Sequence, residues 1–169
     1  MASASNQRVH SVAYAGVFLA LAVVASYIET LLPLSFALPG IKIGLANAVI
    51  MVVCFRCGIK KAALLSCLRI VLSAILFQGL FTILYSFAGA FLSLVSIGLL
   101  YKRKWFSEVG VSVIGAVMHN VGQIIVAAVL VENRKLLLYF PVLLIAGVIS
   151  GAVIGVLAGI VLRRNIGNS

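Results

Sequence analysis

Residues 109–131 read VGVSVIGAVMHNVGQIIVAAVLV and contain no charged side chain. At 1.5 Å per residue, a helix of this length crosses a hydrocarbon core of ~30 Å. His119, Asn120 and Gln123 lie near the middle of the run, where hydrocarbon would otherwise surround them. Polar side chains at that depth usually face a protein interior or a wet cavity. The stretch therefore predicts a membrane helix with a polar face.

Further apolar runs cover residues 11–32, 43–58, 62–77, 81–101 and 139–162. The mean hydropathy of the chain is +1.27, and only 9% of its residues are charged. A water-soluble domain needs a charged surface that this composition does not supply. We therefore predict an all-α polytopic membrane bundle of six transmembrane helices over residues 11–162. Residues 1–10 and 163–169 are predicted to be cytoplasmic tails.

The positive charges indicate how this bundle is oriented. The chain has 13 Lys and Arg residues against three acidic residues, which gives a formal net charge of +10. With the N-terminus inside, nine of them fall on cytoplasmic segments (Arg8, Arg56, Lys60, Lys61, Lys102, Arg103, Lys104, Arg163 and Arg164). Three fall on outer loops (Lys42, Arg134 and Lys135). The positive-inside rule then places both termini in the cytoplasm and the chain in the cytoplasmic membrane. The lipid bilayer, and not nucleic acid, is the partner that these charges indicate.

Two charged residues lie within the apolar runs themselves. Arg69 is midway along the third run, and Glu29 is in the outer third of the first. Two interpretations stay open. In the first, Glu29 and Arg69 form an ion pair that sets the register of two helices. In the second, Arg69 is unpaired in the empty protein and anchors a carboxylate or phosphate.

The corner formed by Pro39 and Gly40 precedes the second run, and residues 33–42 are predicted to form a short re-entrant or interfacial piece. A helix that begins near Lys42 would direct free backbone N–H groups and a cation toward the outer face, beside Asn47. That arrangement suits an anionic ligand. The alternative for Lys42 is a side chain that extends to the lipid headgroups.

The helical repeat places the polar residues of 109–131 on one face. At about 100° per residue, Gly115, His119, Gly122 and Gln123 share that face. Asn120 is the third polar side chain of this cluster. The cluster either lines a pocket or forms hydrogen bonds that hold helices together.

Small residues predict close helix packing in two runs. Gly147, Gly151, Gly155 and Gly159 form overlapping G-x-x-x-G units on one face of the last run. The helix that packs there belongs either to this chain or to another subunit. Gly16 and Ala20 form a weaker pair in the first run.

Several kinds of catalytic site are missing from the sequence. The chain has no G-x-x-x-x-G-K-[ST] motif for ATP, no Asp and three widely spaced Glu residues. It therefore lacks the clustered carboxylates that hold Mg²⁺ in diphosphate chemistry. Cys54, Cys57 and Cys67 are interpreted as small apolar helix residues, and the alternative for the C-x-x-C of Cys54 and Cys57 is a redox or metal role. We predict no enzymatic activity, no bound metal and no cofactor.

Three stretches resemble one known family: residues 39–47 (PGIKIGLAN), Leu68-Arg69, and residues 119–123 (HNVGQ). The family is known as heptaprenyl diphosphate synthase component I and as the Gx transporter family. It is similar to the substrate-binding S components of energy-coupling factor (ECF) transporters. The resemblance implies six membrane helices, a pocket in the outer half, and partnership with a transmembrane T subunit and ATPases. It places Lys42, Asn47, Arg69, His119, Asn120 and Gln123 near that pocket.

The resemblance also makes Gly16 and Ala20 candidates for docking the T subunit, because S components use small residues of the first helix for it. Our leading hypothesis is a membrane component that binds a small anionic solute for uptake and takes its energy from partner ATPases. The alternative is a non-catalytic accessory subunit in polyprenyl diphosphate or quinone metabolism or in membrane redox chemistry. A third interpretation is a purely structural bundle.

Overall fold

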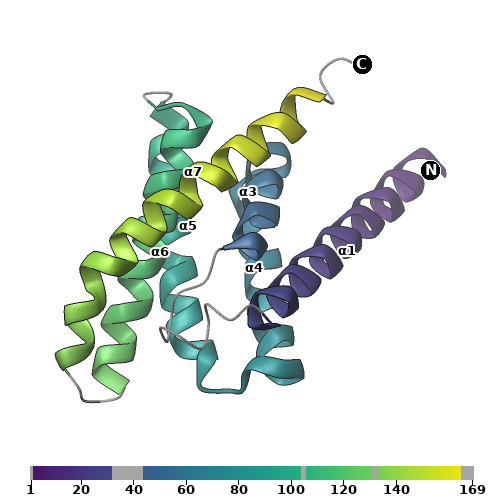
Figure 1. The fold of residues 1–169 in the computed structure, drawn as a ribbon. Helices are drawn as coiled ribbons and strands as arrows, with labels where there is room; N and C mark the ends of the chain where they lie inside the picture. Colours follow the sequence, from purple (N-terminus) through teal and green to yellow (C-terminus); the bar gives the residue numbers. More distant parts are fainter. Residues whose placement is uncertain (1, 32–43, 104–105, 131, 133, 165–169) are drawn as a thin grey trace.

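A computed structural model describes residues 2–31, 44–103, 106–130, 132 and 134–164, and every element in this part of the chain is helical. Figure 1 shows the helices as a bundle. The α-helices are α1 (Ala2–Leu31), α3 (Leu45–Cys57), α4 (Ile59–Ser73), α5 (Thr82–Arg103), α6 (Glu108–Leu130) and α7 (Phe140–Arg164). A π-helical turn, η1 (Ala74–Gln78), extends α4, and a 3₁₀ segment, η2 (Arg134–Tyr139), precedes α7.

Each predicted apolar run overlaps one of these α-helices. At the N-terminus, α1 begins at Ala2, so residues 2–10 of the predicted cytoplasmic tail are helical. The predicted re-entrant piece, residues 33–42, and Lys42 with it, lie outside the described residues.

In the described part of the chain, four helices are long and apolar enough to cross a membrane. They cover Val12–Leu31, Thr82–Leu100, Glu108–Leu130 and Leu137–Val161. The two remaining α-helices are shorter: α3 has 13 residues and α4 has 15. A straight helix of 13 residues is only about 20 Å long, less than the ~30 Å of a hydrocarbon core.

The glycines of α7 set how α7 packs, because they lie against α6. A Cβ atom added at Gly151 would lie 2.6 Å from the Cα of Val113, and one at Gly155 would lie 2.6 Å from the Cα of Val109. Only a residue without a side chain allows two helix backbones to approach this closely. The G-x-x-x-G face of α7 therefore packs inside this chain.

A second face of α6 packs against α5 in the same way. A Cβ atom at Gly122 would lie 2.6 Å from the carbonyl oxygen of Ala88, and one at Gly89 would lie 2.7 Å from that of His119. The helix α6 is thus held closely between α5 and α7.

The helix α3 lies at the centre of the remaining contacts, against α1, α4 and α7. Its residues 50–54 are all buried, so this helix is covered on every side. The helix α1 lies at the edge of the bundle (Figure 1) and exposes many large apolar side chains. Exposed apolar faces of this kind suit contact with lipid.

Arg56 ties three helices together at one end of the bundle. Its Nη1 donates to the Tyr14 hydroxyl of α1 at 2.9 Å, and its Nη2 donates to the carbonyl oxygen of Val161 at 3.2 Å. A cation beside the last carbonyl groups of α7 also complements the negative end of that helix. This end of the bundle carries residues that we predict to be cytoplasmic.

Candidate functional site

A polar pocket lies between the helices, and every α-helix of the described chain contributes to it. We call it the polar pocket. It is lined by Glu29, Gly44, Asn47, Arg69, Ser86, Ala116, His119, Asn120, Gln123, Ser150 and Ile154. Six of the candidate binding residues predicted from the sequence are among these: Glu29, Asn47, Arg69, His119, Asn120 and Gln123. The seventh, Lys42, lies outside the described residues.

The polar face of α6 supplies the wall next to α5. Gly115, His119, Gly122 and Gln123 are all buried, as residues on one helical face can be. The imidazole of His119 and the side chain of Gln123 approach Gly89 of α5, where a Cβ atom would lie 3.0 Å and 2.8 Å from them. Glycine in α5 thus gives these two polar side chains the space that they occupy.

Asn120 lies on the α7 side of the pocket. Its Nδ2 donates to the carbonyl oxygen of Leu143 at 2.8 Å. A Cβ atom at Gly147 would lie 3.0 Å from the same Nδ2, so the glycine is needed for the contact. Asn120 therefore joins α6 to α7 and also lines the pocket. The sequence left open whether this cluster lines a pocket or holds helices together, and Asn120 has both positions.

Glu29 of α1 binds the beginning of α3. Its Oε1 accepts the backbone N–H of Gly44 and that of Leu45, the latter at 2.7 Å. These are among the N–H groups that a helix start leaves without an intrahelical partner, and they favour a negative charge. The carboxylate of this chain therefore occupies the helix start that we expected to face an anionic ligand.

Gly44 is the residue before α3 and has a φ of +85°. Residues with a side chain rarely adopt this conformation. A Cβ atom there would also lie 3.0 Å from Cδ1 of Ile154. Glycine at this position lets the backbone turn so that its N–H points at Glu29.

Arg69 of α4 is 8% exposed, and its guanidinium is incompletely satisfied. Nη1 donates to the Oγ of Ser26 at 3.2 Å. Within the described residues, Nε is buried and has no hydrogen-bond partner. Burial disfavours the charged guanidinium, and the carboxylate of Glu29, which lines the same pocket, partly offsets this. The carboxylate thus helps to keep the cation in the pocket, although its described hydrogen bonds go to α3.

The open space in the polar pocket is small. About 20 Å³ is available to the centre of a water molecule, which corresponds to about one or two waters. The lining is nevertheless rich in groups that hydrogen-bond. In this conformation the pocket has room for a small polar group, and a larger solute would need the helices to separate.

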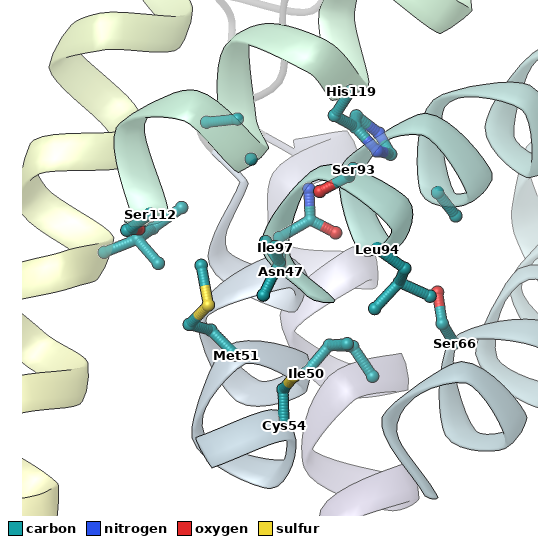
Figure 2. A pocket seen from close by; sticks show the side chains of 14 residues that line it. Asn47, Ile50, Met51, Cys54, Ser66, Ser93, Leu94, Ile97, Ser112 and His119 are labelled. Atoms are coloured by element: carbon teal, nitrogen blue, oxygen red, sulfur yellow. The ribbon is translucent and has the colours of Figure 1, made fainter. Parts of the chain in front are cut away.

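A second small cavity adjoins the polar pocket and shares Asn47, Ala116, His119 and Ile154 with it; we call it the serine pocket (Figure 2). About 30 Å³ of it is available to the centre of a water molecule. It is lined by Asn47, Ile50, Met51, Cys54, Ser66, Ala90, Ser93, Leu94, Ile97, Ser112, Gly115, Ala116, His119 and Ile154. The Oγ of Ser112 is buried and has no partner within the described chain.

Serines are the residues that sequence reasoning missed. Ser26 binds Arg69, Ser86 and Ser150 line the polar pocket, and Ser66 and Ser93 line the serine pocket. Serine occurs widely in membrane helices, where it can hydrogen-bond its own backbone. A serine in an apolar run therefore carries no signal that separates a pocket residue from any other.

Among the remaining candidates, Cys54 lines the serine pocket, whereas Gly16 and Ala20 lie away from both cavities. Gly16 and Ala20 are exposed on α1, and a Cβ atom at Gly16 would meet nothing within 4 Å. Cys54, Cys57 and Cys67 are free thiols. In the described chain, His, Cys, Asp and Glu residues form no group of three that could hold a metal ion.

Comparison with known proteins finds one family. A family model described as heptaprenyl diphosphate synthase component I matches residues 18–161. This range begins within α1 and ends within α7, so it includes every described helix that lines the polar pocket. Neither a curated protein nor a solved structure matches the chain.

Proposed function

We propose that this chain, which belongs to the heptaprenyl diphosphate synthase component I family, binds a small anionic solute for uptake across the membrane. In this proposal it is the substrate-binding membrane component of an ECF-type system. It performs no chemistry and takes its energy from partner ATPases through a T subunit. The solute binds in the polar pocket.

The observation that supports the proposal is the state of Arg69. Placing an arginine at the centre of a membrane helix costs ~2.5–3.5 kcal/mol on insertion scales. A buried N–H group without a partner adds about 1–3 kcal/mol. Arg69 has such a group at Nε, and it lines a pocket together with His119 and Gln123. A solute that supplies the missing acceptor would explain why the residue is there.

The proposed topology has six membrane spans, with both termini in the cytoplasm. The short helices α3 and α4 would cross with help from neighbouring segments, which for α4 includes η1. Arg56 then lies at the cytoplasmic end and Glu29 toward the outer half, where a solute would enter. The exposed small residues Gly16 and Ala20 of α1 are the proposed contact with the T subunit.

The family description favours a second function. A component of heptaprenyl diphosphate synthase would be an accessory membrane subunit of an isoprenoid or quinone pathway, or of membrane redox chemistry. The chain has no Asp and three Glu residues, so the catalytic carboxylates for a diphosphate substrate would come from a partner. In this case the polar pocket positions a lipid headgroup or a partner.

Native mass spectrometry of the gently extracted full-length chain tests both functions. We expect the protein to carry a small anionic molecule, and we expect Arg69→Ala and His119→Ala to lose it. Arg163→Ala, which changes an exposed arginine at the end of α7, is the matched control and should retain it. Equal retention by all variants would contradict the pocket assignment.

The partners that co-purify separate the two functions. A T subunit with ATPases supports uptake, and a prenyl synthase or a flavin-carrying redox protein supports the accessory role. If the Arg69 and His119 variants changed only the thermal stability of the protein, with no ligand or partner lost, the bundle would be purely structural.

A further inference from the structure

We infer that the anionic group of the solute is a carboxylate, which Arg69 binds side-on through Nε and Nη2, and that Ser26 is the positioning residue. This inference rests on the proposed function and specifies its ligand. It depends on three features of the polar pocket: a guanidinium edge without hydrogen-bond partners, the small open space of the pocket, and the charge already present.

The guanidinium has one edge in use and one edge open. Nη1 donates to Ser26, which is fully buried on α1, and Nε has no partner in the described chain. The N–H groups of Nε and Nη2 are parallel and match the two oxygens of a carboxylate. With Nη1 tied to Ser26, the guanidinium cannot turn about its stem without breaking that hydrogen bond. Ser26 therefore holds the guanidinium in the orientation that leaves Nε without a partner in the described chain.

The room in the pocket fits two oxygen atoms better than four. The space of about 20 Å³ for the centre of a water molecule corresponds to about one or two waters. A carboxylate places two oxygens against the guanidinium and leaves the rest of the molecule to extend away. A phosphate group would bring further oxygens into the same space.

The charge of the pocket also favours a monoanion. Among the described lining residues, Arg69 is the one permanently charged cation, and the carboxylate of Glu29 already acts on it. The start of α3 contributes partial positive charge, but Glu29 takes its first N–H groups. Arg69 is then the one described cation that a solute meets in the pocket, so the second charge of a dianion would stay unbalanced in a site shielded from water, which disfavours it.

Nuclear magnetic resonance of the arginine side chains tests the inference directly. The full-length chain has seven arginines, so labelling them with ¹⁵N gives few Nε–H signals, and Arg69→Lys identifies the signal of Arg69. The protein in lipid nanodiscs is titrated with sodium acetate, sodium phosphate and sodium chloride at equal ionic strength. We expect acetate to shift the Arg69 Nε–H signal saturably, phosphate to shift it at least about tenfold more weakly, and chloride to leave it unchanged.

Two variants test the geometry, with line broadening of ¹³C-acetate as the readout. Arg69→Lys keeps the charge but not the paired N–H groups, and we expect acetate affinity to fall about tenfold or more. Ser26→Ala removes one hydrogen bond from the guanidinium, which corresponds to about two- to tenfold weaker acetate binding. In Ser26→Ala the preference for acetate over phosphate should also decrease, which a loss of stability alone would not produce.

Equal shifts with acetate and phosphate would overturn the assignment of a carboxylate. An unchanged Arg69 Nε–H signal with both anions, or full acetate binding by Arg69→Lys, would overturn side-on binding. If Arg69→Ala still lost the ligand retained in native mass spectrometry, these results would refute the inference and leave the proposed function standing. Retention of that ligand by both Arg69→Ala and His119→Ala would instead refute the proposed function.

Discussion

Changing glycine to alanine at three positions tests the packing of the bundle, because the new methyl group meets a different neighbour at each. At Gly16 on α1 it meets nothing within 4 Å. At Gly159 it lies 3.0 Å from Oε2 of Glu108, the end of a flexible side chain. At Gly151 it lies 2.6 Å from the Cα of Val113, which is backbone of α6.

The chemical change is the same at all three positions, so the gain in helix propensity of ~0.8–1.0 kcal/mol is shared and cancels in the comparison. What remains is the steric cost. Carbon atoms in contact are normally about 3.5–4.0 Å apart, so at Gly151 the backbones of α6 and α7 must separate by about 1 Å. Overpacking of this kind costs about 1–3 kcal/mol. Gly151→Ala should therefore be less stable than Gly16→Ala by that amount.

Thermal stability of the purified protein, followed by size-exclusion chromatography after heating, measures the difference. At about 2–4 °C for each kcal/mol in a chain of this size, Gly151→Ala should melt ~2–12 °C below Gly16→Ala. Gly159→Ala should lie close to Gly16→Ala, because the carboxylate of Glu108 can move. Gly155→Ala provides a second test of the α6 contact and should resemble Gly151→Ala.

Melting temperatures for Gly151→Ala and Gly16→Ala that agree within about 1 °C would refute this account of the α6–α7 interface. A large loss at Gly16 would have a different meaning. It would show that this face of α1 is covered in the purified protein, as expected if a partner binds there.

Five further substitutions, at four residues, test individual hydrogen bonds. Glu29→Ala leaves two N–H groups at the start of α3 without their acceptor, and in a thermal melt it should destabilise the protein by about 2–4 kcal/mol. Glu29→Gln keeps an oxygen that can accept these groups, so its loss of stability should be smaller. Arg56→Ala should lower the free energy of unfolding by about 1–3 kcal/mol. Tyr14→Phe removes one of the partners of Arg56 and should lower it by about 0.5–1.5 kcal/mol. Equal losses for the two variants would contradict the assigned contacts. Asn120→Ala removes the bond to the carbonyl oxygen of Leu143 and should cost about 1 kcal/mol, and a melting temperature equal to that of the unchanged protein would show that this bond contributes nothing.

The polar residues of the pocket divide into those that hold helices together and those that have unused hydrogen-bonding capacity. Asn120 joins α6 to α7, and Glu29 joins α1 to α3. Arg69 differs from both, because its Nε is buried without a partner in the described chain. A structural bundle gains nothing from such a group, whereas a binding site needs it. For this reason the proposed function depends on Arg69 more than on any other residue.

Much of the fold followed from the sequence alone. Hydropathy is a local property that adds along the chain, so the apolar runs predicted where each α-helix lies. The helical repeat likewise predicted that His119 and Gln123 share a face with Gly115 and Gly122. Polar residues in apolar runs were candidates for a binding site because they are costly in hydrocarbon. The six candidates that the structure describes line one pocket.

The partners of those residues were decided only by the tertiary structure. Nothing in the sequence distinguishes Ser26, which binds Arg69, from other serines in apolar runs, or shows that Glu29 binds the start of α3. The glycine face of α7 predicted close packing, but not that α6 would fill it. A pattern along one helix indicates which face is polar or small. Which groups come within 3 Å of that face depends on the depth, rotation and spacing of other helices, and these exist only once the chain has folded.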